Sequence, residues 1–567
     1  MVTRAGEDRQ NSGQNTGQQR GRSRRQFLGM VAAAAGSSAL LSSMVGAAPA
    51  AAAPPWEGMA ELPDDIGTGQ SVLVIGAGIA GLGAALQLRQ LGFDVRILEA
   101  QHRAGGRNFT ARNGTEVREV SEAGEVIQTC AFDEGLYINL GPGRIPYHHR
   151  RVLAGCQRLG VALEPYVMET TANVFGSGIW GGPQPNRRVA NDTRGHLAHL
   201  LLRAINKGAL AAELRHLSLA QRKLLTGLLV GFGDLKLVDN AYTYVGSTRC
   251  GDRYPLSVWQ PPEAPPPLPL GELLAARFWE HRFYQPLDHL WQATMFQPVG
   301  GMDRIVEGFT AVLSDVITYN APVTGIELVP DGVVVTWDGG GEPVSELADH
   351  CLSSIPLPVL NGLDLVGFSA DYRDAIGLIE FEPACKVGWQ ANDRFWESDE
   401  NQIYGGISWT DHTIFQVWYP SNDYFSGRGT LTGCYNFGEE ADKFGELSLQ
   451  ERLDTARAGG ARLHPEFEDL SIVPDDKGLS IAWQHVPYQN GGFAHWDPAN
   501  SDAAFAYSTL LAPDGHFHVI GDQVSSLPGW QEGALMSAEY VVKQLLGLER
   551  SDRPVIRRVP DSKALRP

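Results

Sequence analysis

A glycine pattern in the first quarter of the chain carries the clearest chemistry. Gly76-Ala77-Gly78-Ile79-Ala80-Gly81 follows the apolar, β-branched run 71–75 and opens a segment with apolar residues at helical spacing. In a strand–turn–helix unit of this kind, the first glycine permits the tight turn, the second lets the backbone approach a pyrophosphate, and the third lets helix and strand pack closely. The pattern predicts a dinucleotide site with its pyrophosphate at the helix N-terminus.

A carboxylate supports the same interpretation. A second predicted strand, 93–98, ends at Glu99, which lies 18 residues beyond Gly81. A carboxylate at this place can accept hydrogen bonds from ribose hydroxyls, and it disfavours the 2′-phosphate of NADP. The first element of the fold is therefore predicted to be a Rossmann-type βαβ unit.

The segment after Glu99 indicates which class of dinucleotide-binding protein this is. Arg103-Ala104-Gly105-Gly106-Arg107 resembles the RxGGR segment of the FAD-dependent amine oxidase (flavin monoamine oxidase) family. In that family the segment wraps the phosphates and ring of the flavin, so the resemblance implies that Gly106 and Arg107 lie against FAD. Arginine suits this place because its donors are fixed and permanently charged.

A second flavin motif lies near the C-terminus. The predicted strand 516–521 ends at Gly521-Asp522, and Gly529-Trp530 follows just before a predicted helix. This resembles the closing motif of the family, in which the acid meets the ribityl chain and the helix N-terminus faces the flavin pyrimidine. A helix N-terminus there would stabilise negative charge as the flavin is reduced. The motif contains no Cys, so the resemblance implies non-covalent FAD.

The resemblance gives a full set of cofactor residues and no metal site. The predicted FAD contacts are Gly76, Gly78, Ala80, Gly81, Glu99, Ala100, Arg103, Gly106, Arg107, Gly141, Pro142, Gly143, Arg144, Val323, Gly521, Asp522, Gly529, Trp530 and Ala534.

Three residues are candidates for substrate binding. Residues 139–146, Asn-Leu-Gly-Pro-Gly-Arg-Ile-Pro, resemble the L-amino acid oxidase branch, in which the Arg binds the substrate carboxylate. Arg144 suits that role because its planar fork matches two oxygens. Tyr435 aligns with the Tyr that shares carboxylate binding, and Trp530 with the aromatic residue near the substrate. Each has an alternative without a substrate role: a surface or structural Arg, a strand Tyr in the core, or a core Trp.

Lys386 is the catalytic candidate. Cys385-Lys386-Val387, with Arg394-Phe395-Trp396-Glu397 after it, resembles the family's lysine segment. That lysine holds a water against flavin N5, so Lys386 is expected to assist the reaction with O₂. An unpaired lysine among alternating apolar residues would be costly without such a role. The alternative is a strand lysine that extends its amine to solvent.

The resemblance implies a specific reaction. An L-amino acid would lose its Cα hydrogen as hydride to flavin N5, and the imino acid would hydrolyse to a 2-oxo acid and ammonia while O₂ becomes hydrogen peroxide. An amino acid 2-monooxygenase, an amine oxidase without carboxylate recognition and a flavin-binding protein without turnover stay open as alternatives. The side chain of the preferred amino acid is also left open, as is whether the protein forms a homodimer.

Composition limits the other partners. The 567-residue chain has 43% apolar residues, and 65 acidic residues against 46 basic ones. The apolar share is ordinary for a globular protein. The excess of acidic residues opposes binding to nucleic acid. The six cysteines form no CxxC pair, and a single disulfide is left open.

The first 53 residues predict an export signal. Ser23-Arg24-Arg25-Gln26-Phe27-Leu28 precedes a weakly apolar run to about Val45 and a small-residue stretch, which resembles a twin-arginine signal. A secreted or periplasmic enzyme, exported folded by the twin-arginine machinery, is expected. Without residues 1–53, 40 basic and 63 acidic residues remain, a net charge of −23, so no stable membrane association is expected.

The elements combine into an α/β chain, α+β overall. We predict a Rossmann-type FAD-binding domain from discontinuous segments, a mixed-sheet substrate-binding domain and a helical subdomain with a Pro-rich surface loop. The predicted bounds are 1–53 for the signal; 68–135, 297–358 and 505–548 for the FAD-binding domain; 136–145 and 359–504 for the substrate-binding domain; 146–296 for the helical subdomain, with the loop at 255–270; and 549–567 for the tail.

Overall fold

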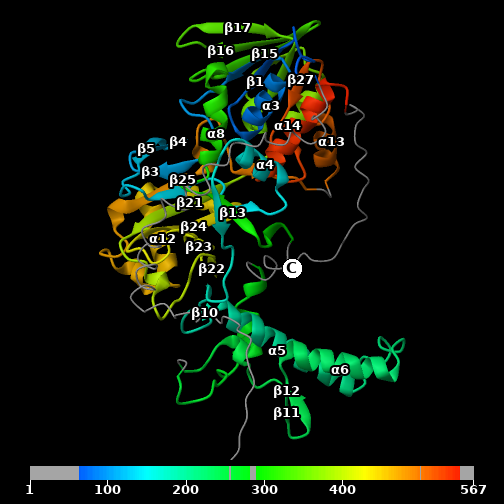
Figure 1. Cartoon of the computed structure of the whole chain (residues 1–567), viewed down its shortest axis with the longest axis vertical. Helices are drawn as coiled ribbons and strands as arrows, with labels where there is room; N and C mark the ends of the chain where they lie inside the picture. Colours follow the sequence, from blue (N-terminus) through cyan, green and yellow to red (C-terminus); the bar gives the residue numbers. More distant parts are fainter. Residues whose placement is uncertain (1–62, 255–256, 281–288, 498–499, 549–567) are drawn as a thin grey trace, which may run out of the picture. The chain divides into compact units, whose positions relative to one another are not determined.

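The computed structural model describes residues 63–254, 257–280, 289–497 and 500–548 (Figure 1). The predicted signal, the predicted tail, and Pro255 and Leu256 of the predicted loop lie outside the described residues. The chain divides between Ala53 and Pro54, and every described residue belongs to the second part. No described helix is long and apolar enough to cross a membrane.

A five-stranded parallel sheet forms the base of the cofactor site. Its order is β14-β2-β1-β18-β27, and the strands come from three separate stretches of the chain. Val74 of β1 pairs with Ile97 of β2 on one side and with Leu352 of β18 on the other. The strands are short and rich in Val, Leu and Ile because both faces of the sheet are covered. Their bounds are β1 Ser71–Ile75, β2 Asp94–Leu98, β14 Ile317–Thr318, β18 His350–Ser353 and β27 Phe517–Val519.

Helices and a second sheet cover the two faces of this parallel sheet. One face packs on helices α3, α4, α8 and α14 through a core that contains Leu82, Phe309 and Leu535. The other face packs on the four-stranded sheet β17-β16-β15-β19 and helices α9, α10 and α13. The bounds are α3 Ile79–Gln90, α4 Arg150–Arg158, α8 Arg304–Leu313, α9 Leu357–Leu360, α10 Ala370–Gly377, α13 Ser501–Leu510, α14 Gln531–Leu545, β15 Val323–Val329, β16 Gly332–Asp338, β17 Pro343–Ala348 and β19 Asp364–Val366.

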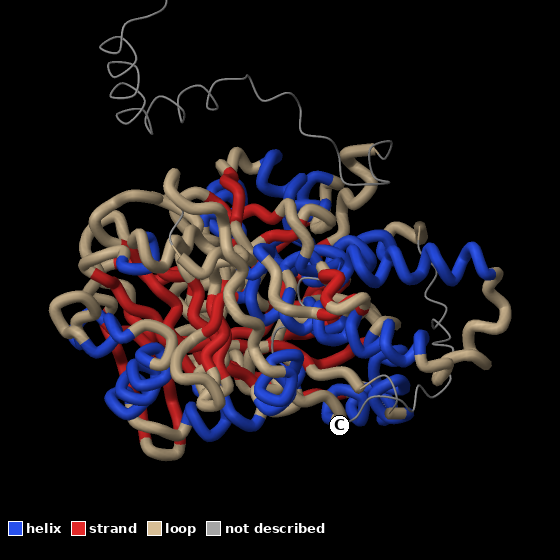
Figure 2. Tube along the Cα trace, turned by 90° about the horizontal axis from the view of Figure 1, so that it is seen from below, coloured by secondary structure: helices blue, strands red, loops and turns tan. Residues whose placement is uncertain are grey.

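A seven-stranded mixed sheet forms the second half of the site. Its order is β10-β9-β22-β23-β24-β21-β25, and β21 is buried along its whole length. Figure 2 shows strands gathered in the left and central parts of the molecule with short helices beside them, and a long helix extending to the right. The bounds are β9 Val174–Gly176, β10 Gln184–Pro185, β21 Ala384–Ala391, β22 Ile407–Thr410, β23 Gln416–Trp418, β24 Gly429–Phe437, β25 Gly478–Ala482, α11 Glu439–Gly445 and α12 Leu449–Ala461.

Small sheets and a helical hairpin complete the described chain. Strand β13 pairs with β7 and β8, β3 with β6, β4 with β5, β11 with β12, and β20 with β26. Helices α5 and α6 pack against each other, and α7 follows the proline-rich segment. The bounds are β3 Thr110–Arg112, β4 Glu116–Ser121, β5 Gly124–Thr129, β6 Tyr137–Asn139, β7 Ile145–Pro146, β8 Leu163–Tyr166, β11 Lys236–Val238, β12 Ala241–Thr243, β13 Met295–Pro298, β20 Phe381–Glu382, β26 Phe493–Ala494, α5 Asn186–Asn206, α6 Leu219–Gly233 and α7 Leu270–Ala275.

The predicted mixed α/β class, with its discontinuous Rossmann-type unit, is confirmed. Two elements lie differently from the predicted bounds. Strand β19, beyond residue 358, pairs with β15, and β9, within the predicted helical subdomain, pairs with β22. Short strands of three residues carry too little periodicity to be assigned to a sheet from sequence.

Candidate functional site

One cavity runs from the glycine turn after β1 to strands β21 and β24 of the mixed sheet. It is lined by residues from both sheets and from the N-terminus of α14. Among the predicted site residues its walls contain Gly76, Gly78, Ala80, Glu99, Ala100, Gly106, Arg107, Gly141, Pro142, Val323, Lys386, Tyr435, Gly521, Asp522, Gly529, Trp530 and Ala534.

The glycine turn leaves one end of the cavity open to a ligand. Gly76 has φ +95°, the left-handed region that glycine tolerates. A Cβ built on Gly78 would have no atom within 4 Å, so there is free space beside the backbone at this residue. A Cβ at Gly81 would lie 2.0 Å from the Gly76 carbonyl oxygen. Gly78 therefore leaves room for a ligand, while Gly81 lets the helix close on the turn.

Glu99 is fixed by backbone donors at the same end. Its carboxylate accepts hydrogen bonds from the Ala77 amide at 2.7 Å and the Gln101 amide at 2.9 Å. Burial raises the pKa of this carboxyl above its usual range, against those amides and the charge of Arg103. The two bonds hold the carboxylate at the end of β2, where a ribose could reach it.

Arg107 and Asp522 form an ion pair across the cavity wall. The Arg107 guanidinium donates to both Asp522 carboxylate oxygens and, at 2.8 Å, to the Gly492 carbonyl. The Asp522 carboxylate also accepts from the Gly529 amide at 2.7 Å. This pair joins the RxGGR segment to the closing motif, so each side chain positions the other.

The start of α14 presents polar groups to the cavity. Trp530 occupies the N-cap position, and the Gln531 amide oxygen accepts a bond from Asn108 Nδ2 at 3.0 Å. Asn108 Oδ1 is buried without a hydrogen-bond partner among the described residues. Both side chains line the cavity. A buried acceptor without a donor is costly, so a donor from a bound molecule would satisfy it.

Lys386 lies where the two sheets approach each other. Strand register sets it directly opposite Tyr435 of β24. Its Nζ donates to the Gly141 carbonyl at 2.5 Å and the Asn139 carbonyl at 3.2 Å, and lies 4.7 Å from the Trp418 ring centroid. Burial and, to a smaller extent, the charge of Arg144 lower the pKa of the ammonium to about 7.

Arg144 is buried in an aromatic box. Its guanidinium carbon lies 4.2 Å from the ring centroid of Trp291, 4.9 Å from that of Trp418 and 5.6 Å from that of Trp530. Its Nε has no hydrogen-bond partner, and among the described residues the groups that raise its pKa are tyrosines rather than a carboxylate. Burial is the larger effect and lowers the pKa of the guanidinium.

Aromatic rings lie against both Lys386 and Arg144, and the Trp418 ring contacts both. Tyr435 meets Trp418 edge-on at 5.2 Å, and Trp530 meets His149 edge-on at 4.9 Å. Burial lowers the pKa of His149 to about 3, which leaves a neutral imidazole beside Arg144. The only charges in this part of the described site are therefore the cations.

Four predicted cofactor residues are not among the residues that line the cavity: Gly81, Arg103, Gly143 and Arg144. Arg103 lies over the Phe109 ring at 3.9 Å. A Cβ at Gly143 would meet the Trp418 ring at 2.7 Å, so this glycine makes room for the aromatic box. Sequence reasoning missed the box residues Trp291 and Trp418, because single tryptophans carry no motif. It also missed a group of wall residues: Asn108, Trp483, Tyr488, Gln489, Gln531 and Phe493.

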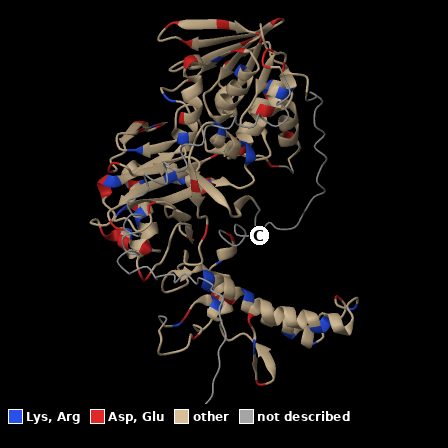
Figure 3. Cartoon of the chain, viewed as in Figure 1, with Lys and Arg blue, Asp and Glu red and all other residues tan. Residues whose placement is uncertain are grey.

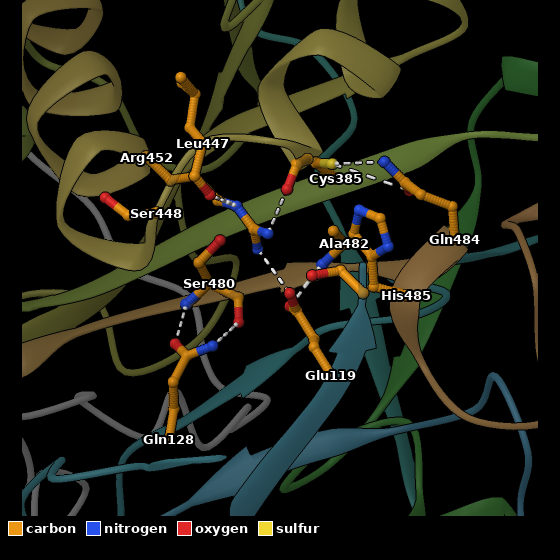
Figure 4. A network of polar contacts seen from close by, with 12 residues as sticks. Glu119, Gln128, Cys385, Leu447, Ser448, Arg452, Ser480, Ala482, Gln484 and His485 are labelled. Carbon is orange, nitrogen blue, oxygen red and sulfur yellow. Dashed lines mark hydrogen bonds and ion pairs between the residues drawn. The ribbon is translucent and has the colours of Figure 1, made fainter. Parts of the chain in front are cut away.

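A buried polar network supports the strand that carries Lys386 (Figure 4). The Glu119 carboxylate accepts bonds from Arg452 Nη1 at 2.7 Å and from the Ala482 amide at 2.8 Å. Gln484 donates to Cys385 Sγ at 3.5 Å, beside Lys386. The network therefore fixes β4, α12 and β25 around β21. All six cysteines are free and buried, and no described group of His, Cys, Asp or Glu could hold a metal ion.

Comparison with known proteins identifies the class. Residues 79–546 match the family model of flavin-containing amine oxidoreductases, and the chain belongs to that family. The flavin-dependent L-tryptophan oxidase RebO of Lentzea aerocolonigenes is 26% identical over 84% of this chain and 98% of its own. An L-amino-acid oxidase of Echis ocellatus is 24% identical over 82% of this chain and 87% of its own.

Solved structures agree on the fold. Wild-type putrescine oxidase bound to putrescine aligns with a TM-score of 0.53 and 19% identity, over 84% of this chain and 99% of that one. At 19% identity this likeness concerns the fold alone. The cofactor of the family is FAD, and the residues present fit it: the open space at Gly78, the fixed Glu99 carboxylate and the unsatisfied Asn108 oxygen all face one elongated cavity.

Proposed function

We propose that the protein is an L-amino acid oxidase that converts an L-amino acid, O₂ and water into a 2-oxo acid, ammonia and hydrogen peroxide. One observation carries the proposal: the buried Arg144, whose Nε has no hydrogen-bond partner among the described residues, lies beside Lys386, Tyr435 and Trp530, which line one end of the FAD cavity. A substrate carboxylate would supply the missing anion. The L-amino acid oxidases among the relatives support the same substrate class.

The side chains of the site have separate roles in binding the substrate and holding a proton. Arg144 and the Tyr435 hydroxyl hold the carboxylate, and Trp530 bounds the space for the rest of the substrate. FAD held in the cavity would supply the two-electron redox chemistry that links oxidation at Cα to reduction of O₂. Lys386, with a pKa of about 7, can hold or release a proton at its Nζ near neutral pH. The imino acid then takes up water and releases ammonia.

Replacing Arg144 tests the proposal. In Arg144→Met, kcat/KM for the best L-amino acid should fall about 1,000-fold, because truncating one partner of a buried charge pair costs 2–5 kcal/mol. Peroxide release is the readout. The decarboxylated amine of the same side chain is the internal control, since its oxidation needs no carboxylate contact and should not fall.

Two results would overturn the role of Arg144. Equal losses on amino acid and amine would assign Arg144 to the scaffold. Unchanged activity on the amino acid would remove it from the site. Flavin absorbance of the purified variant shows whether FAD is retained in either case.

We further propose that the enzyme leaves the cytoplasm folded, through the twin-arginine route. Arg24-Arg25 with Phe27-Leu28 and the weakly apolar run behind them support this. Cell fractionation of Arg24→Lys/Arg25→Lys should find active enzyme retained inside the cell. Export of the variant at the wild-type level would contradict the route.

A further inference from the structure

Two helices of the FAD-binding half begin close together. Helix α4 follows the N-cap residue His149, and α14 follows the N-cap residue Trp530. The rings of these two residues meet edge-on, with their centroids 4.9 Å apart. Neither N-cap side chain bonds to its own helix. The start of a helix carries about half a unit of positive charge, so two starts that lie close together repel each other unless an anion lies near them.

The carboxylate of Glu532 supplies that anion. Glu532 belongs to the first turn of α14, but its carboxylate accepts hydrogen bonds from the first turn of α4: from the Arg151 amide at 3.0 Å and the Val152 amide at 3.0 Å. The Arg151 guanidinium adds a bond from Nη1 at 3.2 Å. The Glu532 side chain is only 4% exposed. Glu532 therefore gives α4 the cap that His149 does not, and it does so from the neighbouring helix.

The start of α14 also borders the FAD cavity. Trp530, Gln531 and Ala534 line the cavity, whereas Glu532 is not among the residues that line it. Trp530 lies at the end of the cavity that contains Lys386. The charge of Glu532 therefore acts from just behind the wall of the cavity, and it forms part of the electrostatic field that a flavin in the cavity would meet.

A second carboxylate on α14 allows a direct comparison. Glu539 lies seven residues further along the helix, a rise of about 10 Å, and its side chain is 3% exposed. It accepts hydrogen bonds from Arg151 Nε at 2.7 Å and from Lys543 Nζ at 2.6 Å. Figure 3 shows basic and acidic residues side by side on the helices of this half of the molecule. Both carboxylates bind Arg151, but only that of Glu532 lies at the start of the helix.

We propose that Glu532 is a positioning residue that holds the starts of α4 and α14 together and lowers the reduction potential of the bound flavin. Its negative charge offsets the positive start of α14, which would otherwise favour the additional negative charge of reduced flavin. The proposal does not depend on which amine or amino acid the enzyme oxidises, because it concerns only the helices beside the FAD cavity.

Redox titration of the holoenzyme against a reference dye tests the effect of the charge. Glu532→Gln keeps the shape of the side chain and removes its charge. At a fixed potential its ratio of reduced to oxidised flavin should rise about tenfold, which is about 30 mV for a two-electron couple. Glu539→Gln is the matched control, and its ratio should change by less than about twofold because its charge lies farther from the cavity.

Thermal unfolding of the same proteins separates the charge from a purely structural role. Loss of the cap should lower the Tm of Glu532→Gln, and a structural contact alone would lower the Tm without a change in the flavin ratio. An unchanged ratio in Glu532→Gln, or an equal change in Glu539→Gln, would therefore overturn the proposal.

A conservative variant and a measurement on wild type keep the test valid if Glu532→Gln does not fold. Glu532→Asp keeps the charge on a shorter side chain, so its Tm should fall while its flavin ratio stays within about twofold of wild type. In wild type, hydrogen exchange in the peptide that contains Arg151 and Val152 should be slow, although amides in the first turn of a helix ordinarily exchange fast. Fast exchange there would overturn the cap, and a tenfold shift in Glu532→Asp would overturn the role of the charge.

Discussion

At the glycine end of the cavity the ligand would meet backbone and small residues, whereas at the lysine end it would meet two buried cations and aromatic rings. The first end comes from one continuous stretch, Gly76 to Glu99. The second brings together Arg144, Lys386, Tyr435 and Trp530 from four distant segments. At the glycine end, the buried Glu99 carboxylate accepts two backbone amide hydrogen bonds, which offset part of its desolvation. The lysine end holds cations in an apolar environment, which stabilises the fold only when an anion arrives.

The largest effect should come from closing the glycine turn. A methyl group at Gly81 would collide with backbone, so Gly81→Ala should lower the free energy of unfolding by about 3 kcal/mol or more. Gly78→Ala is the matched control, since its methyl group meets open space. It should keep its stability as apoprotein and lose FAD affinity. Thermal unfolding and flavin titration measure both, and equal loss of stability would contradict the division of roles.

Removing the buried lysine should increase the free energy of unfolding by an amount that depends on pH. Lys386 has an ordinary pKa of 10.5 when unfolded and about 7 when folded, so the unfolded chain binds more protons between these values and wild-type stability rises with pH there. Lys386→Met should therefore be more stable by a few kcal/mol below pH 7, and this advantage should vanish towards pH 10.5. Chemical denaturation at several pH values measures the difference. A constant difference would show that Lys386 is not desolvated.

Arg144→Met should also stabilise the resting enzyme, by about 1–2 kcal/mol, because Met fills similar space without a desolvated charge. The variant should gain stability while it loses activity on amino acids. Thermal unfolding without substrate shows the gain. A loss of stability would mean that the aromatic box needs the cation.

Tyr435→Phe should have the smallest effect. The ring that meets Trp418 edge-on remains, so stability should change by less than about 0.5 kcal/mol. KM for the amino acid should rise about tenfold with little change in kcat, because one hydrogen bond to the carboxylate is lost. Steady-state peroxide release measures this, and an equal fall in kcat would give Tyr435 a role beyond binding.

The same contrast explains what the sequence could predict. The βαβ unit, Glu99 and the closing motif are local patterns, and strands β1, β2 and β27 lie within a residue or two of their predicted bounds. The aromatic box has no such pattern. Trp291 and Trp418 reach Arg144 only because separate strands and loops converge, and the Lys386–Tyr435 pair depends on the register of β21 and β24.

The most direct test of the central claim is a product balance for wild-type holoenzyme given L-amino acids or the matching amines. We predict one 2-oxo acid, one ammonia and one hydrogen peroxide for each O₂ consumed with an L-amino acid, and slower but measurable turnover of the amine. An amide and carbon dioxide in place of the 2-oxo acid, or faster turnover of the amine, would contradict it.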